Sequence, residues 1–500
     1  MTTEGLAVTT RAASPVILTW GLVLAAGAVV LLAGALSAPA AAVAWGSGAL
    51  AAWCAALLCM TAIAAGREGL GLAQWKLGSW SLAWCAITSG LATAVWSPLQ
   101  QDTAAQLTAA SVLRALWLVA VGMTAWSIGY SSGPRGLAGK FAARVTAALN
   151  SRYSSSVRSR AVPWILYGIG TAARIVTVIT SGRLGDVGSA VASSSAPGYQ
   201  QALALATDCA PLAIAAAALL VCRERAPGTR LTLAVLFAAE ITYGALAGGK
   251  GEYITAVFAM AIPFTAARRR IPKGILAAAA VIFLVIVIPF TRSYRDNAHD
   301  GSATLTPRKA TTAAPGIFRQ VTAATSVSVL SQSLTYLALR VQEIDGPAII
   351  VQRTPSQIPY ASPALLAEGP LTGMIPRALW PGKPILAAGN EFSQQYYGLG
   401  SGTYSSITPT GDLYRHGGWI PEIAGMFVLG CLIRILDDML DVRNPHAIFL
   451  VILLLPVLAE AETDWITMLA DIPALVLTWL VATALTFAMK SQCAGQRPGH

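Results

Sequence analysis

The stretch "LALATDCAPLAIAAAALLVC" (203–222) is an almost unbroken apolar run, and the basic segment "RERAPGTR" (223–230) follows it directly. A transmembrane helix needs about 20 predominantly apolar residues. Cytoplasmic loops of membrane proteins are enriched in Lys and Arg. This one stretch therefore predicts a membrane span and indicates which of its ends faces the cytoplasm.

The composition of the whole chain points the same way. Of its 500 residues, 55% are hydrophobic and 11% are charged, whereas soluble domains carry roughly 25% charged residues. We therefore expect an all-α polytopic membrane protein. The formal net charge of +11 is explained by cytoplasmic Lys and Arg, so no nucleic-acid partner is expected. The seven cysteines form no C-x-x-C pair, which favours packing over a disulfide framework.

Apolar runs of suitable length predict about twelve transmembrane helices. Their expected ranges are 16–37, 43–65, 78–98, 107–130, 162–180, 203–222, 231–247, 252–267, 274–291, 420–436, 445–461 and 467–488. The first run precedes "SAPAAA", which is also compatible with a cleaved signal peptide. We favour a retained helix, because this run is longer than a typical signal sequence and another span follows at once.

The basic residues predict the orientation. They gather in the links 131–161, 223–230 and 268–273 and in the tail after the last span. A twelve-span count puts all of these on one side, which the positive-inside rule assigns to the cytoplasm together with both termini. The expected organisation is nine helices over 1–291, one large extracytoplasmic loop over 292–419, and three helices with a cytoplasmic tail over 420–500. The expected location is the plasma membrane.

The large loop contains "IPRALWPGKP" (375–384), in which three prolines prevent a regular helix. The semi-apolar segment 320–340 of the same loop is typical of a helix lying on the outer membrane surface. Several cations are expected at this face, at the depth where a lipid-linked diphosphate presents its charge. They are Arg183, Lys250, Arg292, Arg295, Arg377 and Lys383. Arg donates paired hydrogen bonds to phosphate oxygens, although such cations can also simply pair with lipid head groups.

A second polar stretch, "GTYSSITPTGDLYRHGGWIPEIAGMFVLG" (402–430), precedes a predicted span. Its hydroxyls and aromatic rings, Tyr414 among them, suit sugar recognition. Asp412 and His416 are candidates to accept a proton from an attacking hydroxyl. The alternative is structural, with Asp412 as a helix cap and His416 as an interfacial polar residue.

Charged residues inside the predicted spans are expected to be paired or functional. Arg174 and Glu240 are candidates for a structural pair or for the site, and Arg114 lies in another span. Four acids crowd the last outer turn and are expected to hold the external cations, or alternatively to supply a base. They are Glu460, Glu462, Asp464 and Asp471.

The sequence contains no Gly-rich nucleotide-binding loop and no His/Cys metal spacing. If the chain is an enzyme, we expect it to work without cofactor or metal, on substrates that arrive already activated.

The order "GGKGEYITAVF", "IPRALWPGKP", "GNEFSQQYYG" and "SSITPTGDLYRHGGW" resembles the oligosaccharide repeat-unit polymerases, the O-antigen polymerase (Wzy-like) family. The resemblance covers about 240–435. It implies an integral-membrane glycosyltransferase of GT-C-like architecture, metal-independent, that joins polyprenyl-diphosphate-linked oligosaccharides at the outer face. It carries over Lys250, Arg377, Lys383 and Asp412, with Lys250 where the family commonly has Arg and Asp412 where it commonly has Glu.

Three functions stay open at this point. A polymerase would build a cell-surface polysaccharide and would work with membrane lipids, a flippase and a chain-length regulator. A ligase of the related O-antigen type would move finished glycan to another acceptor. A transporter or flippase of lipid-linked glycan belongs to a different class, and the absence of two matching halves with broken helices disfavours it.

Overall fold

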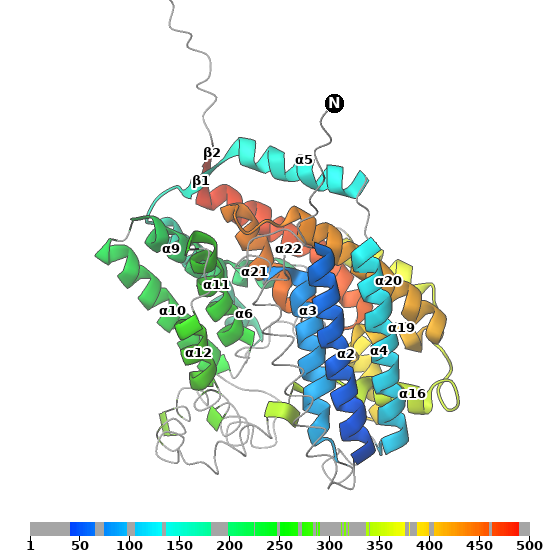
Figure 1. Cartoon of the computed structure of the whole chain (residues 1–500). Helices are drawn as coiled ribbons and strands as arrows, with labels where there is room; N and C mark the ends of the chain where they lie inside the picture. Colours follow the sequence, from blue (N-terminus) through cyan, green and yellow to red (C-terminus); the bar gives the residue numbers. More distant parts are fainter. Residues whose placement is uncertain are drawn as a thin grey trace, which may run out of the picture.

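The computed structural model is an assembly of α-helices, most of them packed side by side (Figure 1). It describes twelve longer segments of the chain, a few short pieces between residues 287 and 339, and the single residue Trp380. The segments are 41–65, 75–97, 106–132, 137–181, 199–224, 226–247, 251–268, 273–283, 341–375, 388–399, 405–459 and 463–489.

The first half of the chain forms a series of helices and one strand. In order, these are α2 (Ala41–Ala65), α3 (Leu77–Cys85) continued by a π-helical turn η2 (Ala86–Gly90) and a 3-10 turn η3 (Leu91–Val95), α4 (Ala109–Ser132), α5 (Leu137–Arg152), strand β1 (Tyr153–Val157), α6 (Val162–Ser181), α8 (Tyr199–Thr207), α9 (Cys209–Glu224), α10 (Pro227–Ala247), α11 (Gly251–Arg268) and α12 (Lys273–Ile282).

Short helices precede three long ones in the second half. They are α16 (Asp345–Arg353), α17 (Leu365–Met374), α18 (Ala388–Phe392), the π-helical η6 (Ser393–Tyr397) and α19 (Pro409–Arg415), followed by α20 (Trp419–Met439), α21 (Pro445–Ala459), α22 (Trp465–Thr486) and strand β2 (Phe487–Met489). The two strands pair antiparallel, far apart in sequence.

Within the described segments, seven helices are long and apolar enough to cross a membrane. They span Ala41–Thr61, Ala109–Ser132, Val162–Thr180, Ala202–Glu224, Pro227–Ala247, Trp419–Met439 and Trp465–Thr486. Each coincides with an expected span, so an all-α, multi-pass membrane protein is confirmed at this level. The count of twelve and the large loop stay predictions; the expected span 16–37 and nearly all of the segment 320–340 lie outside the described residues.

The basic links expected in the cytoplasm meet at one end of the bundle. Arg160 pairs with Glu224 at the end of α9, with 2.7 Å between Nε and Oε2. Arg158 donates from its main-chain nitrogen to the main-chain oxygen of Thr486 at the end of α22 (2.8 Å). The ring of Tyr153 in β1 lies 5.9 Å from the ring of His446 at the start of α21. We call this end of the bundle the basic end.

Glycines let α4 and α20 pack with their backbones in contact. A Cβ atom on Gly129 would collide with the main-chain oxygen of Phe427, and one on Gly430 with that of Trp126. Small residues permit this close approach, which increases van der Waals contact between membrane helices.

Asp437, in the acidic run after the predicted span 420–436, has a structural role at the basic end. Its carboxylate accepts hydrogen bonds from the main-chain nitrogens of Leu77 (2.7 Å) and Gly78 (3.0 Å) and from the Tyr130 hydroxyl (2.8 Å). These donors include two of the free N–H groups at the start of α3, so one side chain joins α3, α4 and α20.

Arg174 on α6 and Glu240 on α10 form the ion pair that the sequence offered as one alternative. Two guanidinium nitrogens donate to the two carboxylate oxygens at 2.7 and 2.6 Å, and both residues are buried. The guanidinium also lies 3.9 Å from the ring centre of Tyr243. A buried charge needs such compensation in an apolar surrounding, so this pair is accounted for by the packing of two helices.

The glycine contact between α4 and α20 yields a matched test. Gly430→Ala should destabilise the protein by about 1–3 kcal/mol, because the added methyl group overpacks a rigid backbone contact. Gly168→Ala, in a part of α6 where no atom lies within 4 Å of the added Cβ, should be neutral or stabilising by up to about 1 kcal/mol. Thermal unfolding of both variants in detergent measures this. Equal melting temperatures would contradict the packing described.

Candidate functional site

The predicted candidates Asp412, Tyr414 and His416 lie on or next to α19, a two-turn helix whose ends are defined by its sequence. Thr408 caps the start, its hydroxyl accepting from the main-chain nitrogen of Gly411 at 3.3 Å, and Pro409 occupies the first turn, where its missing N–H costs nothing. The helix stops at His416 because Gly417 and Gly418 follow with φ angles of 149° and 78°, which favour glycine. Helix α20 begins at the next residue.

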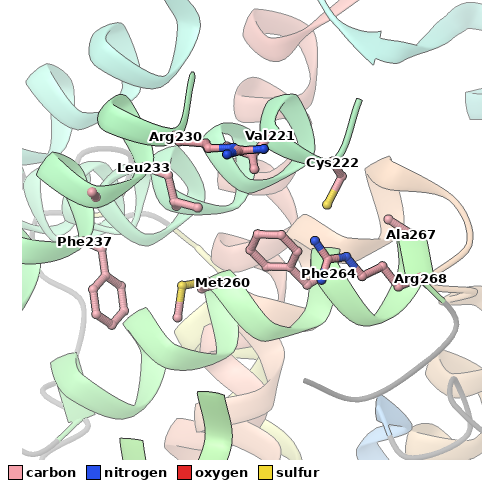
Figure 2. A pocket seen from close by; sticks show the side chains of 10 residues that line it. Val221, Cys222, Arg230, Leu233, Phe237, Met260, Phe264, Ala267 and Arg268 are labelled. Atoms are coloured by element: carbon pink, nitrogen blue, oxygen red, sulfur yellow. The ribbon is translucent and has the colours of Figure 1, made fainter. Parts of the chain in front are cut away.

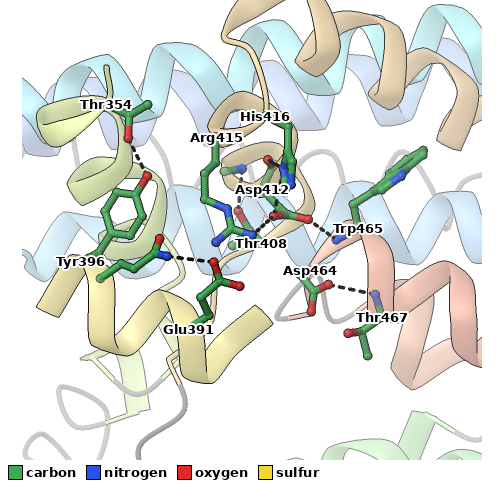
Figure 3. A network of polar contacts seen from close by, with 12 residues as sticks. Thr354, Glu391, Tyr396, Thr408, Asp412, Arg415, His416, Asp464, Trp465 and Thr467 are labelled. Carbon is green, nitrogen blue, oxygen red and sulfur yellow. Dashed lines mark hydrogen bonds and ion pairs between the residues drawn. The ribbon is translucent and has the colours of Figure 1, made fainter. Parts of the chain in front are cut away.

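Asp412 is fully buried and is held on two sides. Its Oδ1 lies 3.1 Å from Nη2 of Arg415, and its Oδ2 accepts from the main-chain nitrogen of Trp465 at 3.2 Å (Figure 3). Burial raises the pKa of Asp412, while the Arg415 charge and the Trp465 hydrogen bond oppose that rise. The Oδ2 hydrogen bond therefore fixes α19 to the start of α22, whereas Oδ1 faces Arg415 of the same helix and has no hydrogen-bond partner within the described segments.

His416 is fully buried as well, and burial lowers its pKa, so the ring is neutral at pH 7. Its Nδ1 lies 2.8 Å from the main-chain oxygen of Asp412. A carbonyl oxygen only accepts, so Nδ1 carries the single proton and Nε2 keeps its lone pair. Within the described segments Nε2 has no hydrogen-bond partner. The arrangement presents an unprotonated nitrogen that can take up a proton.

Arg415 completes the group and was not among the residues singled out from the sequence. It is only 4% exposed. Beyond its contact with Asp412, its Nε and Nη1 have no hydrogen-bond partner in the described part of the chain. A buried guanidinium with open donors is suited to an acceptor oxygen of a ligand. The spacing Asp412-x-x-Arg415, which puts both residues on one helix face, is the signal that could have found it.

Neighbouring elements complete the surroundings of this polar group (Figure 3). Asp464 caps α22 by accepting from the main-chain nitrogen of Thr467 at 2.9 Å, and burial, followed by the nearby Asp412 charge, raises its pKa to about 6. Glu391 of α18 accepts from the side chain of Gln395 at 2.8 Å, and its charge adds to the rise in the pKa of Asp412.

Tyr414 belongs to a separate aromatic group on the same short helix. Its half-buried ring contacts Trp419 edge-on, with ring centres 5.7 Å apart, and Tyr360 at 6.3 Å. Trp419 and Tyr360 are each about 40% exposed. Arg114 of α4 lies close enough for its charge to oppose the burial-driven rise in the pKa of Tyr414. The exposed ring faces offer an apolar surface to a sugar.

The six cations predicted to bind a diphosphate fall outside the described residues. These are Arg183, Lys250, Arg292, Arg295, Arg377 and Lys383. The acids Glu460 and Glu462 also lie outside the described residues. Their meeting at one site stays a prediction. The structure does bring Asp412, His416 and Asp464 together from two parts of the chain.

The described segments contain no group of three or more His, Cys, Asp or Glu side chains placed to hold a metal ion.

Comparison with known proteins identifies a family. The family described as Domain of unknown function (DUF8712) matches residues 174–438. The chain belongs to that family. The matched region begins at Arg174 of the ion pair with Glu240 and includes α19 with Asp412, Arg415 and His416. No curated protein and no solved structure matches the chain.

The raised pKa of Asp464 predicts how stability depends on pH. The folded state holds this proton up to about pH 6, whereas the unfolded state releases it near pH 4. The folded state therefore loses stability as pH rises through this window, on the order of 1–3 kcal/mol. Asp464→Asn keeps a capping acceptor but removes the proton equilibrium.

Melting temperatures of Asp464→Asn and of the unmodified protein, measured in parallel between pH 4 and 8, test this. The variant should gain stability relative to the unmodified protein as pH rises. A difference that does not change with pH would contradict the assignment.

Proposed function

We propose that this chain is an integral-membrane glycosyltransferase that joins polyprenyl-diphosphate-linked oligosaccharide units into a cell-surface polysaccharide at the outer face of the membrane. Three observations support the proposal: the order of motifs that resembles the O-antigen polymerase group, the multi-span helical architecture, and the polar group of Asp412, Arg415 and His416 inside the last of those motifs. The proposal depends above all on two neighbouring features: Nε2 of His416 keeps a free lone pair, and Nε and Nη1 of Arg415 have no hydrogen-bond partner in the described part of the chain.

The reaction needs a base that takes the proton of the acceptor hydroxyl, and hydrogen-bond donors that stabilise the charge developing on the substrate oxygens. In this proposal, Nε2 of His416 takes the proton of the acceptor hydroxyl, and the freed oxygen attacks the anomeric carbon of the donor glycan. A new carbon–oxygen bond forms as the bond to the lipid diphosphate breaks, and the diphosphate leaves with the electron pair. The proton ends on His416.

Asp412 acts as a positioning residue in this scheme. Its carboxylate neutralises Arg415 at 3.1 Å, and its main-chain oxygen orients the His416 ring at 2.8 Å. The open Nε and Nη1 of Arg415 would donate to substrate oxygens as charge develops on them. The diphosphate itself is assigned to the predicted external cations, Arg377 and Lys383 above all.

The polar group is covered in the structure, since Asp412 and His416 have no exposed surface. Catalysis therefore requires a movement that uncovers them before substrate binds. The exposed rings of Tyr360 and Trp419 beside Tyr414 are proposed as the first surface that a glycan contacts.

The proposal places the protein in the plasma membrane with both termini in the cytoplasm. Its substrates are two lipid-linked repeat units, and a flippase and a chain-length regulator are its proposed partners. No cofactor is assigned.

Replacement of His416 tests the proposed base. In a strain whose own copy is deleted, His416→Ala should lower polymer formation at least about a hundredfold, the scale of a lost general base, and single repeat units should accumulate. His446→Ala removes another buried histidine, at the basic end of the bundle, and should retain polymer at equal protein level. The measurement is the length distribution of the lipid-linked glycan in extracted membranes.

Two outcomes contradict the proposal. Normal chain length with folded His416→Ala would exclude His416 as the base. Accumulation of full-length chains on the lipid carrier would assign the chain as a ligase instead of a polymerase.

A further inference from the structure

A second site lies at the basic end of the bundle, between α9, α10 and α11. A pocket of about 760 Å³ opens there and is lined by Leu233, Phe237, Met260 and Phe264 together with two arginines, Arg230 and Arg268 (Figure 2). Because Ala202–Glu224, which contains α9, and Pro227–Ala247 (α10) are long and apolar enough to span a membrane, the pocket lies where the bundle meets one membrane surface.

The two arginines give the pocket its charge. Arg230 lies in the first turn of α10 and Arg268 is the last residue of α11, and both guanidinium groups extend over the pocket from opposite sides (Figure 2). Arg268 also lies 5.3 Å from the ring centre of Phe264, which fixes its direction. The neighbouring acid, Glu224, is paired with Arg160 at 2.7 Å. No acid is among the described residues that line the pocket.

The pocket combines a cationic rim with an apolar interior. Phe237 and Met260 lie about two turns along their helices from the arginines, on the side away from the end of the bundle (Figure 2). A free phosphate ion would use only the rim, and an uncharged lipid tail only the interior. Basic pockets between transmembrane helices fit anionic lipid head groups, and the adjoining apolar groove fits an acyl chain.

We propose that this pocket binds one anionic diacyl phospholipid from the surrounding membrane. The phosphate lies between Arg230 and Arg268, and an acyl chain follows Phe237 and Met260 into the bundle. The site is separate from the polar group of α19, which lies at the start of α20 and α22 and not at their basic ends. The lipid joins α9, α10 and α11, three helices of the matched family region.

Lipid competition on the full-length protein tests the headgroup. The protein is purified in detergent and supplied with equal amounts of phosphatidylglycerol and phosphatidylcholine of identical acyl chains, and bound lipid is counted by native mass spectrometry. The unmodified protein should retain one phosphatidylglycerol with about tenfold preference or more, as two nearby arginines imply. The double variant R230Q/R268Q should lose that preference.

A matched control removes the same charge elsewhere. R152Q/R443Q changes two exposed arginines of the same end that do not line the pocket, and should bind phosphatidylglycerol within about twofold of the unmodified protein. Equal loss in both double variants would show general electrostatic adsorption and overturn the proposal, as would an absence of headgroup preference in the unmodified protein.

A variant without charge change tests the groove. Ala234→Trp places a large side chain into the pocket lining and should displace the lipid while both arginines remain. Full retention of phosphatidylglycerol by this variant, with its folding verified by an unchanged melting temperature, would show that the lipid lies elsewhere.

Discussion

The backbone contact between α4 and α20 is the constraint on which the arrangement of the candidate site depends. Gly129 and Gly430 let main-chain oxygens of the opposite helix approach where a Cβ would stand. A third glycine, Gly122, leaves room for the carboxyl group of Glu422 and a methyl group of Thr410. The separation of these two helices therefore also determines where α19 lies, because only two residues separate His416 from the start of α20 and α19 carries Thr410.

The polar group of Asp412, Arg415 and His416 shows how charged side chains are accommodated in the buried surroundings of α19. Asp412 and Arg415 neutralise each other, and His416 avoids a charge altogether because burial lowers its pKa. The result is a buried group with little net charge that still offers open hydrogen-bonding atoms: Nε2 of His416 and two nitrogens of Arg415. Fully structural groups in protein interiors rarely leave such atoms without a partner, which is why a ligand is the natural account of them.

Hydropathy predicted the seven long apolar helices, because length and apolar content are what a span requires. It did not predict the π-helical and 3-10 turns that continue α3, since these depend on packing against α2. The Arg174–Glu240 pair could be predicted from the sequence as one alternative, because charged side chains inside membrane spans need partners. Asp412 and His416 could be predicted as unusual polar residues, but the hydrogen bond from Trp465 to Asp412 could not, since 53 residues separate the bonded groups. The role of Asp437 could not be predicted for the same reason, since its two main-chain donors lie 360 and 359 positions away and the Tyr130 hydroxyl 307.

The central claim is that the α19 group and the basic end lie on opposite sides of the membrane, with α19 outside. Single cysteines at Ser362, exposed near the main chain of Arg415, and at Arg443, exposed at the basic end, test it directly in a background without other reactive cysteines. A membrane-impermeant thiol reagent applied to intact cells should label Ser362→Cys, and should label Arg443→Cys only after the membrane is opened. Labelling of Arg443→Cys in intact cells, with Ser362→Cys protected, would contradict the account.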